Sequence, residues 1–166
     1  MEPFAVLGTL RDVQNVFAKH SVTAAVVALG DNRKRKCLVD SLKESRAIHP
    51  RATIGSGVII GDGTVVMAGA VINCVSRIER HCIVNTMASV DHDCRVEDYA
   101  SLAPRATLCG AVHVGSLAAV CAGAVVVQRV KIGEGAILGA ASHARHDIPS
   151  SVQYGNPAIH VRDLKS

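Results

Sequence analysis

The chain has 166 residues, of which 49% are hydrophobic and only 2% aromatic, with no tryptophan. A formal net charge of +4 spread along the chain, with so few aromatics to stack on bases, argues against nucleic-acid binding. Apolar runs such as 24–29 are too short for a membrane span, so we expect a cytoplasmic protein that binds neither nucleic acid nor membrane.

Residues 1–47 predict a small, shortened α/β segment of the kind that forms half of a nucleotide-binding unit. Thr9 is a candidate helix cap, and apolar residues follow it at helical spacing as far as position 20. A β-branched and apolar strand is expected at 23–29, and a second amphipathic helix at 33–45. The four basic residues at 33–36 are interpreted as a solvated face of this second helix.

Residues 48–143 repeat with a period of six. Starting at Ile48, every sixth residue is Ile, Val or Leu: Ile48, Ile54, Ile60, Val66, Ile72, Ile78, Val84, Val90, Val96, Leu102, Leu108, Val114, Val120, Val126, Ile132 and Leu138. The residue four places after each of these is small or β-branched. This period fits neither a helix nor a long strand, but it fits a three-sided parallel β-helix with three hexapeptides to a coil. Sixteen hexapeptides make about five coils, in a mainly β fold.

The remaining residues, 144–166, are rich in turn formers and are expected to leave the coil and cap its open end. The six cysteines include no C-x-x-C pair, so zinc-binding spacing is absent. Cys82 and Cys94 fall at inward positions of the repeat, where we expect them to act as small apolar side chains.

One edge of the coil carries a candidate catalytic group. Positions that differ by eighteen stack on the same edge, so His92 should lie beside Gly110 on the next coil, with backbones about 5 Å apart. An imidazole can take a proton from an attacking nucleophile, and an exposed glycine N–H can hold an oxyanion. Asp91 and Asp93 flank the histidine, and spacing leaves open which of them reaches the ring.

The segment Asn85-Thr86-Met87-Ala88-Ser89-Val90-Asp91-His92-Asp93-Cys94 resembles the active-site stretch of nucleotide-sugar and sialic acid acetyltransferases, a family that includes bacillosamine N-acetyltransferase. The hexapeptides at 60–65 and 132–137 look like those of left-handed β-helix acyltransferases. The resemblance covers most of residues 23–160, and the predicted handedness comes from it.

By this resemblance, acetyl-CoA is the co-substrate, no metal is needed, and the acceptor is an amino or hydroxyl group of a nucleotide-linked sugar. The resemblance implies a homotrimer with acetyl-CoA in a groove between neighbouring β-helices. It makes His92 the general base, Asp93 its orienting acid and Gly110 the contact of the acetyl carbonyl. It also implies further site positions, for the sugar Asn85, Asp91 and Ser101, and for CoA Gly110, Gly139, Ala140, Asn156, Pro157 and Ala158.

Several positions depart from the family pattern. No G-x-G-x-x-G loop is present in the amino-terminal segment, and Ser101 stands where many members carry a second histidine. Leu117, Cys121 and Gln128 replace the usual glycines or proline at corners, which predicts distorted corners because non-glycine residues adopt positive φ at a cost.

Two other functions fit parts of the sequence. A non-catalytic trimeric β-helix would explain the shortened amino-terminal segment. A zinc hydratase resembling the γ-class carbonic anhydrases would need three converging histidines, and His81, His92 and His113 lack the matching spacing.

Overall fold

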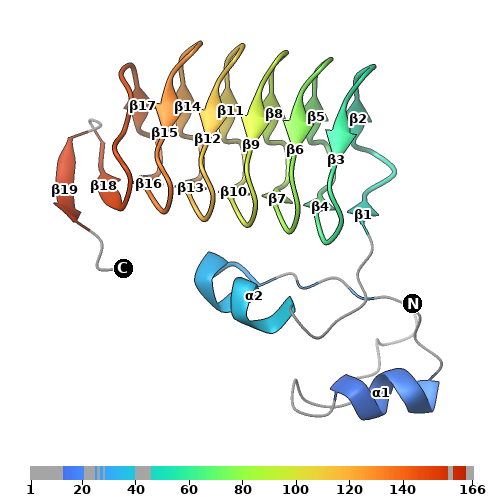
Figure 1. The fold of residues 1–166 in the computed structure, drawn as a ribbon. Helices are drawn as coiled ribbons and strands as arrows, with labels where there is room; N and C mark the ends of the chain where they lie inside the picture. Colours follow the sequence, from blue (N-terminus) through green and yellow to red (C-terminus); the bar gives the residue numbers. More distant parts are fainter. Residues whose placement is uncertain are drawn as a thin grey trace.

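The computed structural model describes residues 13–20, 25, 27, 29–39, 46–156 and 159–163. Two short helices, α1 (Val13–His20) and α2 (Asn32–Val39), precede a regular stack of two-residue strands (Figure 1). These strands are β1 (Ala47–Ile48), β2 (Thr53–Ile54), β3 (Ile59–Ile60), β4 (Val65–Val66), β5 (Val71–Ile72), β6 (Arg77–Ile78), β7 (Ile83–Val84), β8 (Ser89–Val90), β9 (Arg95–Val96), β10 (Ser101–Leu102), β11 (Thr107–Leu108), β12 (His113–Val114), β13 (Ala119–Val120), β14 (Val125–Val126), β15 (Lys131–Ile132), β16 (Ile137–Leu138) and β17 (His143–Ala144). Two longer strands, β18 (Val152–Tyr154) and β19 (His160–Asp163), end the described chain.

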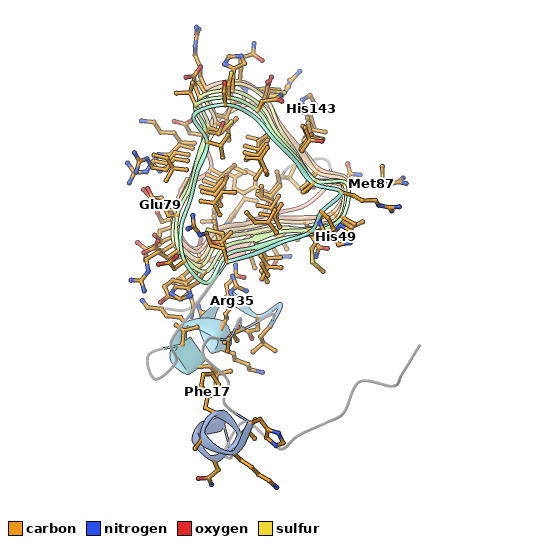
Figure 2. All side chains as sticks on the ribbon, turned by 90° about the vertical axis from the view of Figure 1, so that its right-hand side faces the viewer. Phe17, Arg35, His49, Glu79, Met87 and His143 are labelled. Atoms are coloured by element: carbon orange, nitrogen blue, oxygen red, sulfur yellow. The ribbon has the colours of Figure 1, made fainter. Side chains whose placement is uncertain are left out.

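The strands form three sheets that make the three faces of a prism, and all pairs are parallel except β18 with β19. The eight-stranded sheet has the order β1-β4-β7-β10-β13-β16-β18-β19, the six-stranded sheet β17-β14-β11-β8-β5-β2, and the five-stranded sheet β15-β12-β9-β6-β3. From β1 to β17, partners along each sheet differ by eighteen residues, as in Ser89 with Thr107, which confirms the predicted coil length. Seen along its axis, the coil has a triangular outline with α2 outside one corner (Figure 2).

The coil is slightly longer than predicted. It begins at Ala47 and runs through Ala144, giving about six turns in place of about five. Ala144 keeps the six-residue step and is buried, but it is smaller than the Ile, Val and Leu side chains that define the repeat. Ile148 and Tyr154 then continue the pairing beyond it, through a bridge to Ile132 and through β18 alongside β16.

The second residue of each strand points into the prism and builds its core. From Ile60 to Leu138 every inward aliphatic residue of the repeat is buried, whereas Ile48 and Ile54 at the first coil keep 44% and 37% of their surface exposed. Cys82 and Cys94 are buried among them, as predicted. Burial raises the pKa of Cys82 to about 12 and that of Cys94 to about 11, so both thiols stay protonated and serve as apolar filler.

From Gly57 to Ala141, each corner of the prism has one residue in the left-handed backbone region, three places after the inward aliphatic residue. Most of these residues are not glycine. Leu117 adopts a positive φ of 63°. Cys121 and Gln128 do not have a positive φ, because the left-handed residues of their corners are Gly123 and Arg129, the latter with a φ of 64°. The predicted distortion at these corners is therefore wrong. Backbone hydrogen bonds of 3.0 Å to the preceding coil hold Leu117 and Arg129 in place, so pairing continues unbroken past them.

The amino-terminal helices agree in part with the sequence. Both predicted helices are present over their described residues, but most of 23–29 and all of 40–45 lie outside the described part of the chain. The interpretation of 33–36 as a solvated face is wrong for Arg35, whose side chain is fully buried. None of the described helices is long and apolar enough to cross a membrane.

Arg35 is buried because it joins α2 to the prism. Its guanidinium donates hydrogen bonds to the backbone carbonyls of Leu29 (2.6 Å), His81 (2.9 Å) and Tyr99 (2.6 Å). The neighbouring Asn32 donates to the carbonyls of Leu117 and Ala118. Helix α2 thus rests on one corner of the prism, between the five-stranded and eight-stranded sheets (Figure 2).

Candidate active site

His92 lies at the corner between β8 and β9, where the six-stranded sheet meets the five-stranded sheet. We call this corner, along all coils, the His92 edge. The Ala111 N–H donates to the His92 carbonyl at 2.9 Å, which fixes Gly110 directly beside the histidine on the next coil. A Cβ at position 110 would lie 2.8 Å from both Cε1 and Nε2 of His92, so only glycine lets the ring take this position. The structure therefore brings together the two groups that the coil spacing paired.

Asp93 is the acid that reaches the ring. Its Oδ2 lies 2.8 Å from His92 Nδ1. An ionised carboxylate only accepts hydrogen bonds, so Nδ1 carries the proton and Nε2 of the neutral imidazole is left as the acceptor facing Gly110. The hydrogen bond to Asp93, with the nearby charges of Asp91 and Asp93, raises the pKa of His92 above its ordinary value.

Asp91 is held by backbone and side-chain groups instead. It accepts hydrogen bonds from the Asn73 side-chain amide at 3.0 Å and from the His92 N–H at 2.9 Å, and these lower the pKa of its carboxyl group. Sequence reasoning missed Asn73. It precedes Asp91 by one coil of eighteen residues, so the same spacing that paired His92 with Gly110 could have found it.

The Gly110 N–H has no acceptor among the described residues. Its neighbours Cys109 and Ala111 donate their N–H groups to Val126 and His92, but within this part of the chain no hydrogen bond is formed by the N–H of Gly110. Gly110 itself is buried beside the exposed His92 side chain, so a base nitrogen and an unbonded N–H lie next to each other at this edge. This pair can remove a proton from a nucleophile and stabilise the oxyanion that forms when the nucleophile adds to a carbonyl.

Other predicted site positions lie elsewhere in the single chain. Asn85, Gly139 and Ala140 occupy the corner between the eight-stranded and six-stranded sheets, and the Asn85 side chain accepts a hydrogen bond from the Thr86 N–H at 2.7 Å. Ser101 lies on the outer side of β10 in the eight-stranded sheet, which does not border the His92 edge. Within one chain these four residues therefore do not lie beside His92. The position of a residue within the coil determines which corner or face it occupies, and the resemblance alone does not supply that position.

The predicted CoA residues of the tail are only partly described. Asn156 is exposed and lines an open cavity of about 470 Å³ at the last coil, together with His143, Arg145, His146 and Tyr154. Pro157 and Ala158 lie outside the described residues.

The histidines that a zinc site would need are apart. His81 is buried and stacks on Tyr99 at one corner, whereas the His113 Nε2 lies 2.9 Å from Glu97 on the five-stranded sheet. In the described part of the chain, no three metal-binding side chains gather to hold an ion.

The fold and sequence are similar to those of known acetyltransferases. One is a histidine-to-asparagine mutant of perosamine N-acetyltransferase from Caulobacter crescentus, solved in complex with CoA and GDP-perosamine. It is 37% identical, with a TM-score of 0.83, over 89% of this chain and 73% of that one. Another is the acetyltransferase domain of PglB from Neisseria gonorrhoeae FA1090 in complex with acetyl coenzyme A, 33% identical, with a TM-score of 0.86, over 97% of this chain and 80% of that one.

The chain belongs to the hexapeptide-repeat acyltransferase family. This confirms the resemblance, and with it the left-handed β-helix. Among curated proteins, GDP-perosamine N-acetyltransferase from Escherichia coli O157:H7 is 32% identical over 123 residues, which make up 70% of this chain and 54% of that protein. The chain spans about half the length of the curated relatives it matches. A comparison with protein-family models found no match.

Proposed function

We propose that this chain transfers an acetyl group from acetyl-CoA to the amino group of a nucleotide-linked amino sugar, with His92 as the general base. The observation that carries the proposal is the His92 edge, where a carboxylate-oriented imidazole lies directly beside the backbone of Gly110, whose N–H has no acceptor among the described residues. The relatives support it, since two are N-acetyltransferases of perosamine or GDP-perosamine and one of these was solved with CoA and GDP-perosamine. Their names favour an amino group over a hydroxyl group as the acceptor.

The geometry implies a direct transfer. His92 Nε2 accepts the proton from the amine as the nitrogen attacks the thioester carbonyl, so the C–N bond forms while the Gly110 N–H donates to the oxyanion. Asp93 holds the ring and stabilises its positive charge in this state. When the C–S bond breaks, the protonated His92 returns the proton to the leaving thiolate. No cysteine nucleophile takes part.

The test is an acetyl-transfer assay with the purified chain. We expect thiol release from acetyl-CoA that depends on a GDP- or UDP-linked amino sugar, with the acetylated sugar identified by mass spectrometry. The competing function, a non-catalytic scaffold, predicts no thiol release with any amino sugar and no saturable heat when CoA is titrated into the protein.

The pKa of His92 gives the proposal a pH signature. A base must be neutral to act, so the rate rises with pH through the His92 pKa, which Asp93 holds above its ordinary value. Asp93→Asn removes the charge, and asparagine tolerates the left-handed backbone at this position, where φ is 58°. We expect the acid limb of the kcat/KM profile, measured from about pH 5 to 9, to move to lower pH.

Asp163→Asn is the matched control for this profile. Asp163 pairs with His160 at 3.0 Å on β19, away from the His92 edge, so its profile should stay like that of the unmodified protein. If the acid limb of the Asp93→Asn profile stays at the same pH, Asp93 is not the group that raises the pKa of His92.

We also propose that the protein assembles as a homotrimer in the cytoplasm. The outward positions of the coil strands on two faces hold no Asp, Glu, Lys or Arg: Ala47, Val65, Ile83, Ser101, Ala119 and Ile137 on the eight-stranded sheet, and Thr53, Val71, Ser89, Thr107, Val125 and His143 on the six-stranded sheet. Faces without these side chains suit contacts between copies. The six free cysteines fit a reducing compartment. Sedimentation equilibrium should give three times the chain mass of 17.4 kDa, and a monomer mass would contradict the trimer.

A further inference from the structure

Asn73 and Asp91 form a polar pair at the His92 edge that the proposed mechanism does not use. They follow β5 and β8 and lie one coil apart, and the Asn73 Nδ2 donates to Asp91 Oδ1 at 3.0 Å. The backbone fixes both residues, because their N–H groups donate to the carbonyls of Val90 and Leu108 on the following coils. Both side chains therefore start from fixed positions in the corner.

The two hydrogen bonds to the Asp91 side chain use the same carboxylate oxygen. Oδ1 accepts from the Asn73 amide and, at 2.9 Å, from the His92 N–H. In the described part of the chain, no donor reaches Oδ2. The Asn73 amide and the His92 N–H lower the pKa of the Asp91 carboxyl group, and an ionised carboxylate only accepts hydrogen bonds. Oδ2 is therefore an open acceptor.

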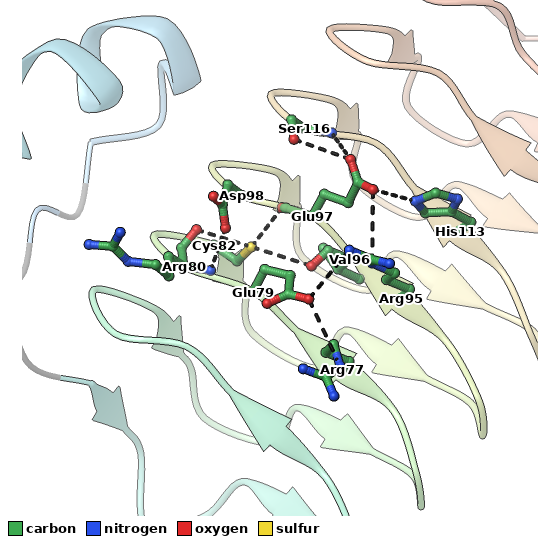
Figure 3. A network of polar contacts seen from close by, with 10 residues as sticks. All are labelled: Arg77, Glu79, Arg80, Cys82, Arg95, Val96, Glu97, Asp98, His113 and Ser116. Atoms are coloured by element: carbon green, nitrogen blue, oxygen red, sulfur yellow. Dashed lines mark hydrogen bonds and ion pairs between the residues drawn. The ribbon is translucent and has the colours of Figure 1, made fainter.

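Glu97 shows a carboxylate whose two oxygens are both used within the chain (Figure 3). Its Oε1 lies 2.9 Å from His113 Nε2, and its Oε2 accepts from the N–H and the Oγ of Ser116, both at 3.2 Å. Such a carboxylate has little left to offer a ligand. Asp91 differs because its partners leave one oxygen open, next to the proposed base.

Asn73 holds Asp91 from one side only. On the other adjacent coil the equivalent position is Cys109, and in the described part of the chain no hydrogen bond joins its side chain to Asp91. After the hydrogen bond to Asp93, the charge of Asp91 is the next cause that raises the pKa of His92, so this carboxylate lies close to the imidazole. Asn73 therefore determines which oxygen of Asp91 stays open beside the base.

Amines and hydroxyls differ in the number of hydrogens that they can offer at this place. A neutral amine gives one proton to His92 Nε2 as its nitrogen attacks, and its second hydrogen stays on the nitrogen and becomes the N–H of the product amide. A hydroxyl gives its single proton to His92, and the product ester has none, so Asp91 Oδ2 would face oxygen lone pairs. A site built to hydrogen-bond an N–H disfavours an analogue that lacks it.

We propose that Asn73 is a positioning residue, which holds Asp91 so that Oδ2 accepts the remaining N–H of the acceptor and selects an amine over a hydroxyl. This inference rests on the proposed acetyl transfer and names the acceptor class of that same site. The attacking nitrogen gains positive charge as the C–N bond forms, and the Asp91 carboxylate stabilises that charge. Neither Asn73 nor Asp91 exchanges a proton.

The kinetic test uses Asn73→Ala and the isosteric Asn73→Asp. Asn73→Ala removes the donor, and we expect kcat/KM for the amino sugar to fall about tenfold or more, while the KM for acetyl-CoA stays unchanged. Asn73→Asp should lower kcat/KM further, since it places a like charge beside Asp91. The matched control Ser116→Ala removes a hydrogen bond that reaches Glu97 from an adjacent coil, and it should leave kcat/KM unchanged.

A double-mutant cycle shows whether Asn73 acts through Asp91. Asp91→Asn should lower kcat/KM for the amino sugar, and Asn73→Ala added to it should cause no further loss. A purely structural role of Asn73 would instead lower kcat/KM by the same factor in both backgrounds. That additive result, or full activity in Asn73→Ala, would overturn the inference.

A binding test separates this inference from the proposed reaction. Each nucleotide-linked amino sugar of the transfer assay is titrated into the protein with CoA present, beside the analogue in which a hydroxyl replaces the amino group. We expect the amino sugar to bind more tightly, and the ratio of the two Kd values to fall toward one in Asn73→Ala, whether or not acetyl transfer is detected. Equal Kd values in the unmodified protein, an unchanged ratio in Asn73→Ala, or no binding of either sugar would overturn the inference. Acetyl transfer with an unchanged ratio would refute the role of Asn73 and leave the proposed function standing.

Discussion

Replacing His92 with alanine is expected to lower kcat by about 10²–10⁴, the usual contribution of a positioned general base. The variant should keep its fold, because the His92 side chain is exposed and its loss leaves no buried group unpaired. Single-turnover kinetics with saturating substrates measures the chemical step directly.

His160→Ala is the matched control for this experiment. His160 forms a similar pair with Asp163, at 3.0 Å, and its side chain is half exposed like that of His92. Its removal should leave kcat unchanged. Full activity in His92→Ala would show that the proton leaves the amine by another route.

Arg35→Ala is expected to release α2 from the prism. The buried guanidinium satisfies three backbone carbonyls, and removing one partner of such a buried charged contact costs about 3 kcal/mol or more. The loss should be local, because the coils pair with one another and not through α2. Hydrogen exchange should therefore become faster in 32–39 and stay slow in the strands.

Two further variants make this result specific. Arg35→Lys should fail to restore protection, since a single ammonium group cannot reproduce the planar set of donors that reaches three carbonyls. Lys34→Ala, at a neighbouring position whose side chain is 76% exposed, should leave exchange in α2 unchanged. Unchanged protection of α2 in Arg35→Ala would mean that other contacts hold the helix.

The coil and its catalytic edge could be predicted because both follow from counting residues. A six-residue rhythm determines which side chains are buried, and a multiple of eighteen determines which residues are neighbours. His92 beside Gly110 is a direct result of that counting, and Asn73 beside Asp91 would have followed from it too.

Other features depend on side-chain geometry that counting does not supply. Asp93 reaches the imidazole, whereas the carboxylate of Asp91 accepts hydrogen bonds from Asn73 and from the His92 N–H. Arg35 is buried because three carbonyls converge on it from segments as far apart as Leu29 and Tyr99, which no local pattern of charge reveals. Leu117 keeps a regular corner because hydrogen bonds from the adjacent coil outweigh its own backbone preference.

The most direct test of the central claim is a crystal structure of His92→Ala with acetyl-CoA bound. We predict the thioester carbonyl oxygen about 3 Å from the Gly110 nitrogen, a typical hydrogen-bond distance, with the acetyl group on the edge that position 92 occupies. An acetyl group bound at another edge, or a carbonyl oxygen with no contact to the Gly110 N–H, would contradict the account.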